Sequence, residues 1–292
     1  MVEHPGSVGQ LADLLRQGGY LADRGLATAL YLSMSLPRPI LLEGEVGVGK
    51  TEAAKVLASV FGRRLIRLQC YEGIDTNQAL YEWDYARQML AIRALSERQV
   101  AAEDAVDQLF GPKFLLERPL LAAVRAGDQA VLLIDEVDRA DDEFEAFLLE
   151  VLSDFQVSIP EIGTITAPAP PLVVLTSNRT RELHDALNRR CLYHWIGYPS
   201  AEREVEIVLI KEPGVSQALA RKVVAAVHRL RELDLAKPPG VAETIDWART
   251  LDLLGGTDLD PQLAQDTLGA VVKERDDLDL VQENLEEITS GA

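Results

Sequence analysis

Apolar and polar positions along the first two thirds of the chain predict strands that alternate with helices. Short apolar runs bounded by turn residues are typical of buried strands, whereas apolar residues three or four positions apart are typical of amphipathic helices. The expected strands are 40–43, 65–70, 131–134, 172–176 and 192–196. The expected helices are two within 8–36 and one each at 51–61, 96–109, 115–126 and 143–152. Such alternation predicts a mostly parallel sheet covered by helices on both faces.

The pattern changes after Pro199, where only helical spacing remains. The expected helices are 201–211, 217–233, 241–254 and 261–276, with glycine and proline residues between them. We therefore expect an α/β domain over residues 1–198 and a small all-helical domain over 199–292. Within the first domain, β-prone runs on both sides of Gly163 predict a hairpin inside 155–166.

The composition of the 292-residue chain narrows the classes of function. Apolar residues make up 47% and charged residues 26%, as in ordinary globular proteins, and no apolar run approaches the ~20 residues of a membrane span. The net charge of −18 disfavours nucleic acid as the main partner. The two cysteines and four histidines lack metal-ligand spacing, and the N-terminus shows no secretory signal. We therefore expect a cytoplasmic protein without a structural metal.

The first expected strand runs directly into a glycine-rich segment that has the spacing of a phosphate-binding loop. The pattern G-x-x-x-x-G-K-[ST] is complete, and the expected nucleotide-binding residues are Gly44, Glu45, Val46, Gly47, Val48, Gly49, Lys50 and Thr51. Glycines let several backbone N–H groups point at phosphate oxygens at the start of a helix. Lys50 would reach the β- and γ-phosphates, and the Thr51 hydroxyl would bind Mg²⁺. The segment therefore predicts ATP and Mg²⁺ as cofactors.

Three later features could complete an active site. Strand 131–134 leads into Asp135, which could hold Mg²⁺ through water, and Glu136, which could polarise an attacking water. Asn178 follows the next expected strand and could orient water or contact the γ-phosphate, although asparagine is also common in turns. Arg189 and Arg190 precede the last strand. They could belong to the active site, or they could simply pair with nearby carboxylates.

Together these features resemble the AAA+ ATPases, whose fold is a P-loop NTPase with a doubly wound parallel sheet and a C-terminal helical lid. The resemblance implies that residues 44–51 are the Walker A loop, that Asp135 and Glu136 are the Walker B pair, and that Asn178 is sensor 1. It also implies that Arg189 or Arg190 is an arginine finger that acts on the neighbouring subunit of a ring, which we expect to be a hexamer.

The insert at 71–85, the hairpin and the segment 135–140 (DEVDRA) resemble the helix-2-insert group and its MoxR-type members. Among these, the chain is most similar to the accessory ATPases of carbon monoxide dehydrogenase and related molybdenum hydroxylases. The resemblance implies a chaperone that matures a client metalloenzyme, with a von Willebrand A-domain protein as a possible partner. MoxR-type proteins commonly carry a sensor-2 arginine early in a lid helix. Here Thr244 takes that position, and Arg249 lies more than a turn later.

Two details of the insert region stay open. Its aromatic residues could contact a client, but packing is the more common role of such side chains. Gln69 or Cys70, at the end of the second strand, could restrain Glu136 before a client binds. Three other functions also remain open: a monomeric P-loop kinase acting on a small metabolite, a nucleic-acid motor, and an ATP-gated scaffold with negligible turnover.

Overall fold

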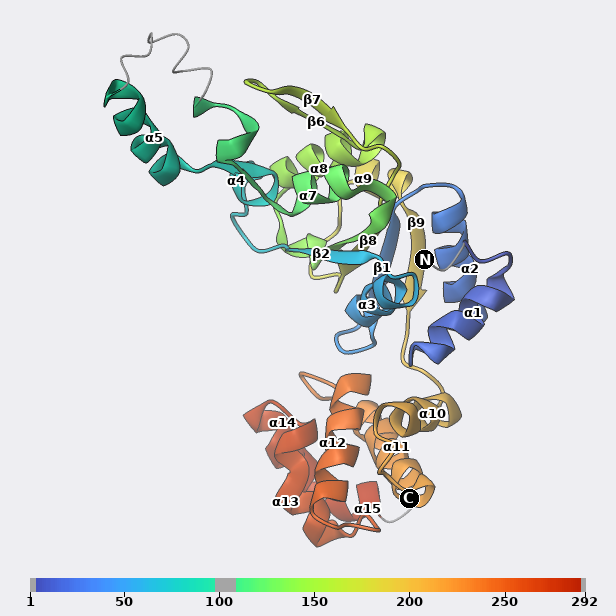
Figure 1. Cartoon of the computed structure of the whole chain (residues 1–292). Coiled ribbons are helices and arrows are strands. Elements are labelled where there is room, and N and C mark those ends of the chain that lie inside the picture. Colours follow the sequence, from blue (N-terminus) through green and yellow to red (C-terminus); the bar gives the residue numbers. More distant parts are fainter. Residues whose placement is uncertain (1–3, 98–108, 290–292) are drawn as a thin grey trace. The chain divides into compact units, whose positions relative to one another are not determined.

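A computed structural model of the chain describes residues 4–97 and 109–289 (Figure 1). The predicted helix at 96–109 therefore lies mostly outside the described residues. The chain forms two compact units, each assembled from several segments. Unit 1 comprises the described residues of Met1–Leu14, Asp23–Glu43 and Ala54–His194, and unit 2 those of Leu15–Ala22, Gly44–Ala53 and Trp195–Ala292. The domain boundary at 198/199 stays a prediction.

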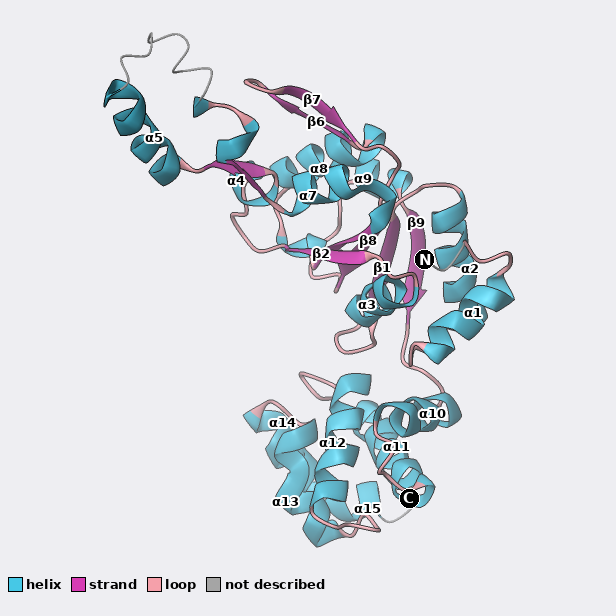
Figure 2. Ribbon diagram, in the orientation of Figure 1, coloured by secondary structure: helices cyan, strands magenta, loops and turns pink. Residues whose placement is uncertain are grey.

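A five-stranded sheet forms the centre of unit 1, with the strand order β2-β5-β8-β1-β9. The strands are β1 (Ile40–Gly44), β2 (Arg64–Gln69), β5 (Ala130–Asp135), β8 (Leu172–Ser177) and β9 (Leu192–Ile196). β8 pairs in parallel with both β1 and β5, and β5 pairs in parallel with β2 (Figure 2). Every residue of β5 and β8 is buried, as expected for central strands with helices on both faces. The predicted parallel sheet is confirmed.

Helices surround this sheet. They are α1 (Val8–Gln17), α2 (Arg24–Ser35), α3 (Lys50–Val60), α7 (Pro119–Ala126), α8 (Asp142–Asp154) and α9 (Asp185–Arg190). Helices α3 and α8 begin within one residue of their predicted starts, whereas α9 was not predicted. Asp23 and Asp141 cap the N-termini of α2 and α8, because their carboxylates accept hydrogen bonds from backbone N–H groups of the first turn. The predicted hairpin is confirmed as β6 (Gln156–Ile159) and β7 (Gly163–Thr166), which pair antiparallel.

The insert between β2 and α7 differs from the prediction. It contains α4 (Thr76–Ala79), β3 (Tyr81–Trp83), α5 (Tyr85–Glu97), the 3₁₀ turn η1 (Pro112–Phe114) and β4 (Leu115–Glu117). The helix predicted from residue 115 starts only at Pro119, because proline suits the first helical position and disfavours helix in the residue before it. Residues 115–117 pair with β3 instead. Of the insert's aromatic side chains, Trp83 is buried, whereas Tyr71 and Tyr85 are exposed.

Helices make up most of unit 2. They are α10 (Ala201–Lys211), α11 (Gln217–Glu232), α12 (Val241–Leu253), α13 (Pro261–Val271), α14 (Arg275–Glu283) and α15 (Leu285–Thr289). The single helix predicted at 261–276 is wrong: α13 ends at Val271, because Val272 has extended backbone, and α14 starts afresh. The restart lets the buried Asp277 accept hydrogen bonds from the N–H groups of Ala236 and Lys237. None of the helices in the described part of the chain is long and apolar enough to cross a bilayer.

Candidate functional site

The phosphate-binding loop lies in unit 2, at the end of β1, and its glycines are required by the backbone. A Cβ atom at Gly44 would stand 2.1 Å from the carbonyl oxygen of Ile196, so a side chain there would collide with backbone. Gly47 has a φ of 77°, which side chains rarely tolerate, and a Cβ there would also press on Gly240 at 3.1 Å. The loop can therefore keep its shape only with glycine at these two positions.

Lys50 is the first residue of α3, and its ammonium group is buried inside the loop. Its side chain is 7% exposed, and Nζ donates hydrogen bonds to the carbonyl oxygens of Gly44 at 2.8 Å and Glu45 at 2.6 Å. A buried ammonium that donates to carbonyl oxygens can also serve as a partner for an anion. With the N-terminus of α3 beside it, this arrangement fits the phosphates of a nucleotide.

Helix α12 is joined to the same loop through the backbone, also within unit 2. The N–H groups of Val241 and Ala242 donate to the carbonyl oxygen of Gly47 at 3.1 and 3.3 Å. Glu243 accepts from the N–H of Gly240 at 2.9 Å and so caps the helix. The loop therefore satisfies backbone donors at the start of a lid helix, which otherwise lack partners.

A buried carboxylate connects three helices of unit 2. Glu204 on α10 is fully buried, and its two oxygens each accept a hydrogen bond of 2.7 Å from Arg231 on α11. Thr244 on α12 donates to the same carboxylate at 2.6 Å, and a ring nitrogen of His228 lies 2.9 Å from it. The guanidinium of Arg231 also stacks over the ring of Tyr198 at 4.3 Å. Thr244, the residue at the expected sensor-2 position, is thus buried in this network.

Unit 1 holds the two acidic residues predicted at the end of β5. Asp135 is 3% exposed, and both its oxygens have partners. Oδ1 accepts from the Thr176 hydroxyl on β8 at 2.6 Å, and Oδ2 accepts from Arg67 on β2 at 2.5 and 3.0 Å. Because a buried carboxylate is costly without hydrogen bonds and an opposite charge, these two partners stabilise the Asp135 side chain within the sheet.

Glu136 follows in left-handed backbone, with φ 54° and ψ 52°. A non-glycine residue in this conformation costs roughly 1–3 kcal/mol, and such strain is concentrated at functional sites. The Thr176 hydroxyl stabilises the turn by accepting the N–H of Glu136 at 2.9 Å. The Gln69 amide donates to Glu136 Oε2 at 3.0 Å, and Arg139 lies 3.2 Å from the same oxygen. Of the two residues predicted to restrain Glu136, the structure thus gives Gln69 a side-chain contact.

Cys70, the alternative to Gln69, has different chemistry. It is fully buried, and burial together with the nearby carboxylates, Asp135 foremost, raises the pKa of its thiol to about 12. Burial also raises the pKa of Cys191 to about 12, against the opposing effect of Arg38. Both thiols therefore stay protonated at neutral pH and cannot serve as nucleophiles. Among the residues that the structure describes, no group of three or more His, Cys, Asp or Glu side chains could hold a metal ion.

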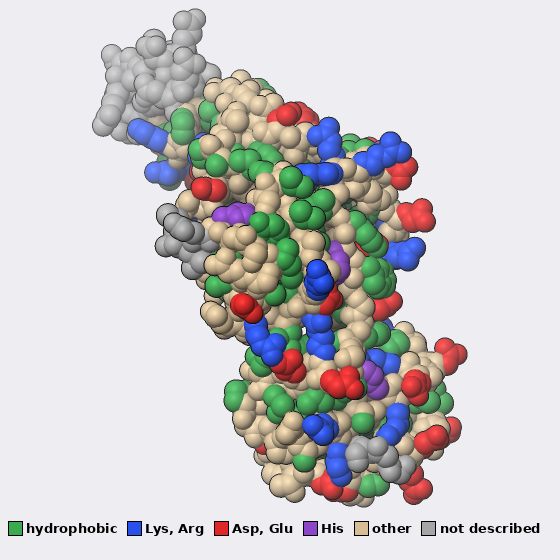
Figure 3. Space-filling model, turned by 90° about the vertical axis from the view of Figure 1, so that its right-hand side faces the viewer, with side chains coloured by type: hydrophobic (Ala, Val, Ile, Leu, Met, Phe, Trp, Pro, Cys, Tyr) green, Lys and Arg blue, Asp and Glu red, His purple; other side chains and the backbone are tan. Residues whose placement is uncertain are grey.

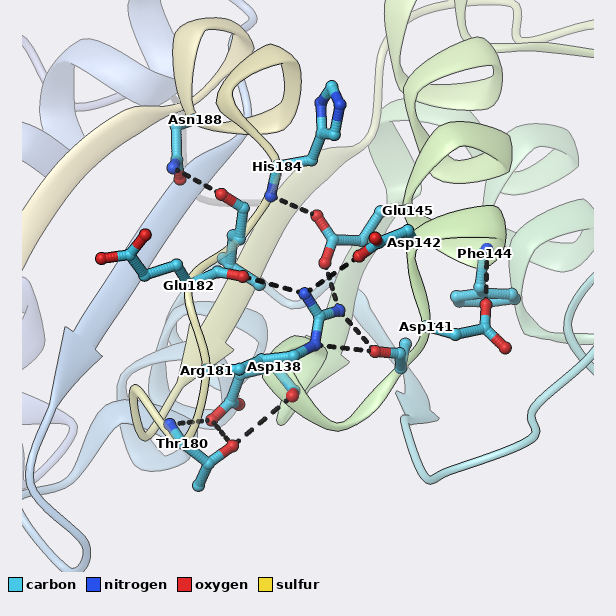
Figure 4. Close-up of polar contacts among 12 residues, drawn as sticks. Asp138, Asp141, Asp142, Phe144, Glu145, Thr180, Arg181, Glu182, His184 and Asn188 are labelled. Atoms are coloured by element: carbon cyan, nitrogen blue, oxygen red, sulfur yellow. Dashed lines mark hydrogen bonds and ion pairs between the residues drawn. The ribbon is translucent and has the colours of Figure 1, made fainter.

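Asn178 stands where β8 ends, beside the turn η3 (Val137–Arg139) that follows β5. Its N–H donates to Oδ2 of the buried Asp138 at 3.2 Å. The N–H and the hydroxyl of Thr180 donate to the same oxygen at 2.9 and 2.7 Å (Figure 4). Arg181 then reaches toward α8, where it bonds to the fully buried Glu145 (Figure 4). These contacts fasten the segment after β8 to the segment after β5, and so fix Asn178 relative to Glu136.

Arg189 and Arg190 form the last turn of α9, and both are exposed. The predicted site residues thus fall into two groups. Gly44–Thr51 lie in unit 2, and Asp135, Glu136, Asn178 and both arginines lie in unit 1. Sequence reasoning did not identify Arg67, Thr176, Asp138 or Arg38, which contact predicted site residues. The alternation along β2 could have indicated Arg67, since it places Arg67 and Gln69 on one face of the strand.

Known proteins similar to this chain indicate its family. The AAA domain family, in its dynein-related subfamily, matches residues 39–191, just over half of the chain. The chaperone MoxR1 of Mycobacterium tuberculosis is 29% identical over 203 residues, which cover 68% of this chain and 46% of MoxR1. The denitrification regulatory protein NirQ of Pseudomonas aeruginosa is 25% identical over 236 residues, which cover 77% of this chain and 79% of NirQ.

Among solved structures, a mutant of RuvB from Thermotoga maritima superposes with a TM-score of 0.51 and 16% identity. The match covers 99% of this chain and 82% of RuvB. At this identity the likeness concerns the fold alone. The chain spans less than half the length of MoxR1, so the activity and partners of that whole protein are a matter for proposal.

Proposed function

The chain belongs to the AAA domain family, in its dynein-related subfamily, as a MoxR-type AAA+ ATPase, and on that premise we propose that it hydrolyses ATP as a ring-forming chaperone. One observation carries the proposal. The two carboxylates that end β5 are held by Thr176, Arg67 and Gln69, in the same parallel sheet whose strand β1 leads into a complete phosphate-binding loop. We also propose the division into an ATPase domain, residues 1–198, and a helical lid, residues 199–292.

The loop residues would bind the phosphates. Backbone N–H groups of Gly44–Thr51 would surround them, and the Lys50 ammonium would exchange its two carbonyl partners for phosphate oxygens. The Thr51 hydroxyl would ligate Mg²⁺ directly, and Asp135 would hold it through water. When bound, Mg²⁺ neutralises charge on the β- and γ-phosphates.

The residues of unit 1 would cleave the terminal phosphate. Glu136 would accept a proton from the attacking water, and Asn178 would orient that water or contact the γ-phosphate. The Gln69 amide occupies one oxygen of Glu136, so we propose that it restrains Glu136 until a client binds. An exposed arginine of the neighbouring subunit, Arg189 or Arg190, would stabilise the charge of the transition state, a contribution that can reach about 10³–10⁵ in rate.

The assembly and client form the finer part of the proposal. A finger that acts on a neighbour requires a ring, for which we propose six subunits. We further propose that the client is a metalloenzyme of the molybdenum hydroxylase or carbon monoxide dehydrogenase type, with a von Willebrand A-domain protein as co-partner. The resemblance to accessory ATPases supports this choice. Nucleic acid is a weaker candidate, because the net charge is −18 and acidic and basic side chains are interspersed on the face seen in Figure 3.

The exchange Glu136→Gln tests the catalytic assignment. The variant removes the proton acceptor but keeps the size and hydrogen bonding of the side chain, so ATP should still bind while turnover falls by about 10²-fold or more. Equilibrium binding of a fluorescent ATP analogue and phosphate release measure the two effects separately. The exchange Glu143→Gln, on the exposed side of α8, is a matched control. Wild-type turnover in Glu136→Gln would refute the assignment.

A mixing experiment tests the finger. Lys50→Ala subunits should lack nucleotide binding but keep both arginines. Arg190→Ala subunits keep an intact loop but lack the Arg190 finger candidate. Each should be inactive alone, and mixtures should recover activity because an intact loop then meets an intact finger. Light scattering must show that mixed rings form. A stable monomer in ATP would favour the small-metabolite kinase instead.

A further inference from the structure

The two finger candidates sit on a short helix that is held from outside by a third arginine. Arg38 lies in the segment just before β1, and its guanidinium reaches the last carbonyl groups of α9. Nη2 donates to the carbonyl oxygens of Arg189 at 2.9 Å and Arg190 at 3.1 Å, and Nε donates to that of Arg190 at 3.3 Å. The Arg38 side chain is thus hydrogen-bonded to the backbone of both finger candidates.

The contact has a clear physical origin. The last carbonyls of a helix have no partner within the helix, and a cation is favoured there by the helix dipole. Arginine suits the position because its planar fork can span two acceptors, whereas the lysine ammonium is a point charge on a flexible stem. Since α9 has only six residues, it has few internal hydrogen bonds of its own to fix its end.

Arg38 is itself anchored through its backbone. Its N–H donates to the carbonyl oxygen of Ser33 at 3.2 Å, and the hydroxyl of this buried serine donates back to the carbonyl oxygen of Arg38 at 2.6 Å. The next residue, Pro39, accepts the N–H of Leu192 at 2.8 Å. The segment that places Arg38 against α9 is therefore bonded to α2 through Ser33 and to β9 through Leu192.

The contact between Arg38 and α9 also leaves the positive charges of Arg189 and Arg190 available. A carboxylate in the same place would attract the side chains of Arg189 and Arg190 and compensate their charge. The Arg38 guanidinium bonds to their carbonyl groups, so the helix end is fixed while Arg189 and Arg190 stay exposed. A finger needs this combination, because a preorganised positive charge stabilises a transition state without reorganisation at the moment of reaction.

We propose that Arg38 is a positioning residue, which holds the end of α9 so that Arg189 or Arg190 meets the nucleotide of the neighbouring subunit. The inference rests on the proposed arginine finger. Displacing a catalytic group by about 1 Å can cost about 10²-fold in rate. Arg38 should therefore act on kcat of the neighbouring site, with little effect on the affinity of its own loop for ATP.

The test compares Arg38→Ala and Arg38→Lys with Arg189→Ala, Arg190→Ala and the control Arg64→Ala, an exposed arginine at the start of β2. We expect kcat of Arg38→Ala to fall by about 10- to 100-fold while KM for ATP stays within about twofold. Arg38→Lys should recover part of the loss. Mixing Arg38→Ala with Lys50→Ala subunits should restore activity, as expected for Arg190→Ala.

The outcomes distinguish failure of the finger from failure of the positioning role. If neither Arg189→Ala nor Arg190→Ala lowers kcat, the proposed finger is wrong and the inference falls with it. If one of them does, but Arg38→Ala matches Arg64→Ala, the finger stands and the positioning role is refuted. Failure of Arg38→Ala to recover in rings mixed with Lys50→Ala would also refute it, because the defect would then lie in its own nucleotide site.

Discussion

The hydroxyl of Thr176 allows a sharp prediction, because this single group serves both acidic residues of the candidate site. It donates to Asp135 at 2.6 Å and accepts the N–H of Glu136 at 2.9 Å, and the side chain is 1% exposed. The exchange Thr176→Val keeps the shape and volume of the side chain but removes both bonds. Thr176→Ser is the matched control, since it keeps the hydroxyl and loses only a methyl group.

The magnitude follows from the two bonds. A hydrogen bond to a charged group contributes about 1.5–3 kcal/mol, and a partly buried N–H left without a partner costs about 1 kcal/mol. Thr176→Val should therefore lower the free energy of unfolding by about 2–4 kcal/mol. Loss of one buried methyl group in Thr176→Ser should cost only about 1 kcal/mol. Turnover should follow the same order, because the hydroxyl also fixes the strained backbone of Glu136.

Urea unfolding followed by circular dichroism measures the difference, provided that the slope of the transition is unchanged. Phosphate release under saturating ATP measures turnover of the same samples. Two results would refute the reasoning. The first is a Thr176→Val protein as stable as Thr176→Ser, within about 0.5 kcal/mol. The second is a Thr176→Val protein that is destabilised as expected but hydrolyses ATP at the wild-type rate, since the hydroxyl would then not serve Glu136.

Two further predictions concern charges and thiols in unit 1. Arg67→Met should destabilise the protein by about 1–3 kcal/mol, because it removes the ion pair between Arg67 and the buried Asp135 carboxylate, and the loss should shrink in an Asp135→Asn background. Thermal unfolding of the four variants gives this comparison, and an equal loss in both backgrounds would contradict it. The pKa of Cys70 and Cys191, about 12 in the folded chain, lies above the ordinary value of 9.0, so their contribution to stability is present below pH 9 and is lost between pH 9 and 12. At pH 8 iodoacetamide should modify neither thiol until urea is added, and mass spectrometry would detect any exception.

The sheet and most helices could be predicted because their signals are local. Strand β5 is apolar at consecutive positions, and α12 repeats apolar residues at helical spacing, so each element can be predicted from its own residues. The errors arose where one pattern fits two structures. Leu115–Glu117 continues the apolar spacing of α7, but Pro119 starts the helix and β3 offers the preceding residues a partner. Tertiary pairing then outweighed local preference.

The candidate site shows the same limit more strongly. The loop residues and the two acids stand in contiguous motifs, so their residue types and spacing suffice to propose them. The residues that hold them come from distant parts of the chain. Arg67 is 68 positions from Asp135, Thr176 is 41 positions from it, and Arg38 is 151 positions from Arg189. No pattern in one sequence links such pairs, because only the strand order of the sheet and the α9–β9 corner bring them together.

The lid shows how such a distant contact can change the interpretation of a motif. From sequence, Thr244 is expected at the sensor-2 position, where related proteins carry an arginine, while Arg249 on the same helix is exposed. In unit 2, the arginine near Thr244 is instead Arg231 of α11, whose Nη2 lies 3.4 Å from the threonine hydroxyl. Glu204 binds both side chains, and α12 meets the loop through Gly47. Arg231 therefore takes part in a buried ion pair with Glu204. Separating that pair would leave Glu204 buried without the Arg231 charge, which is costly. Arg231 is thus better suited to hold the lid helices together than to reach a phosphate.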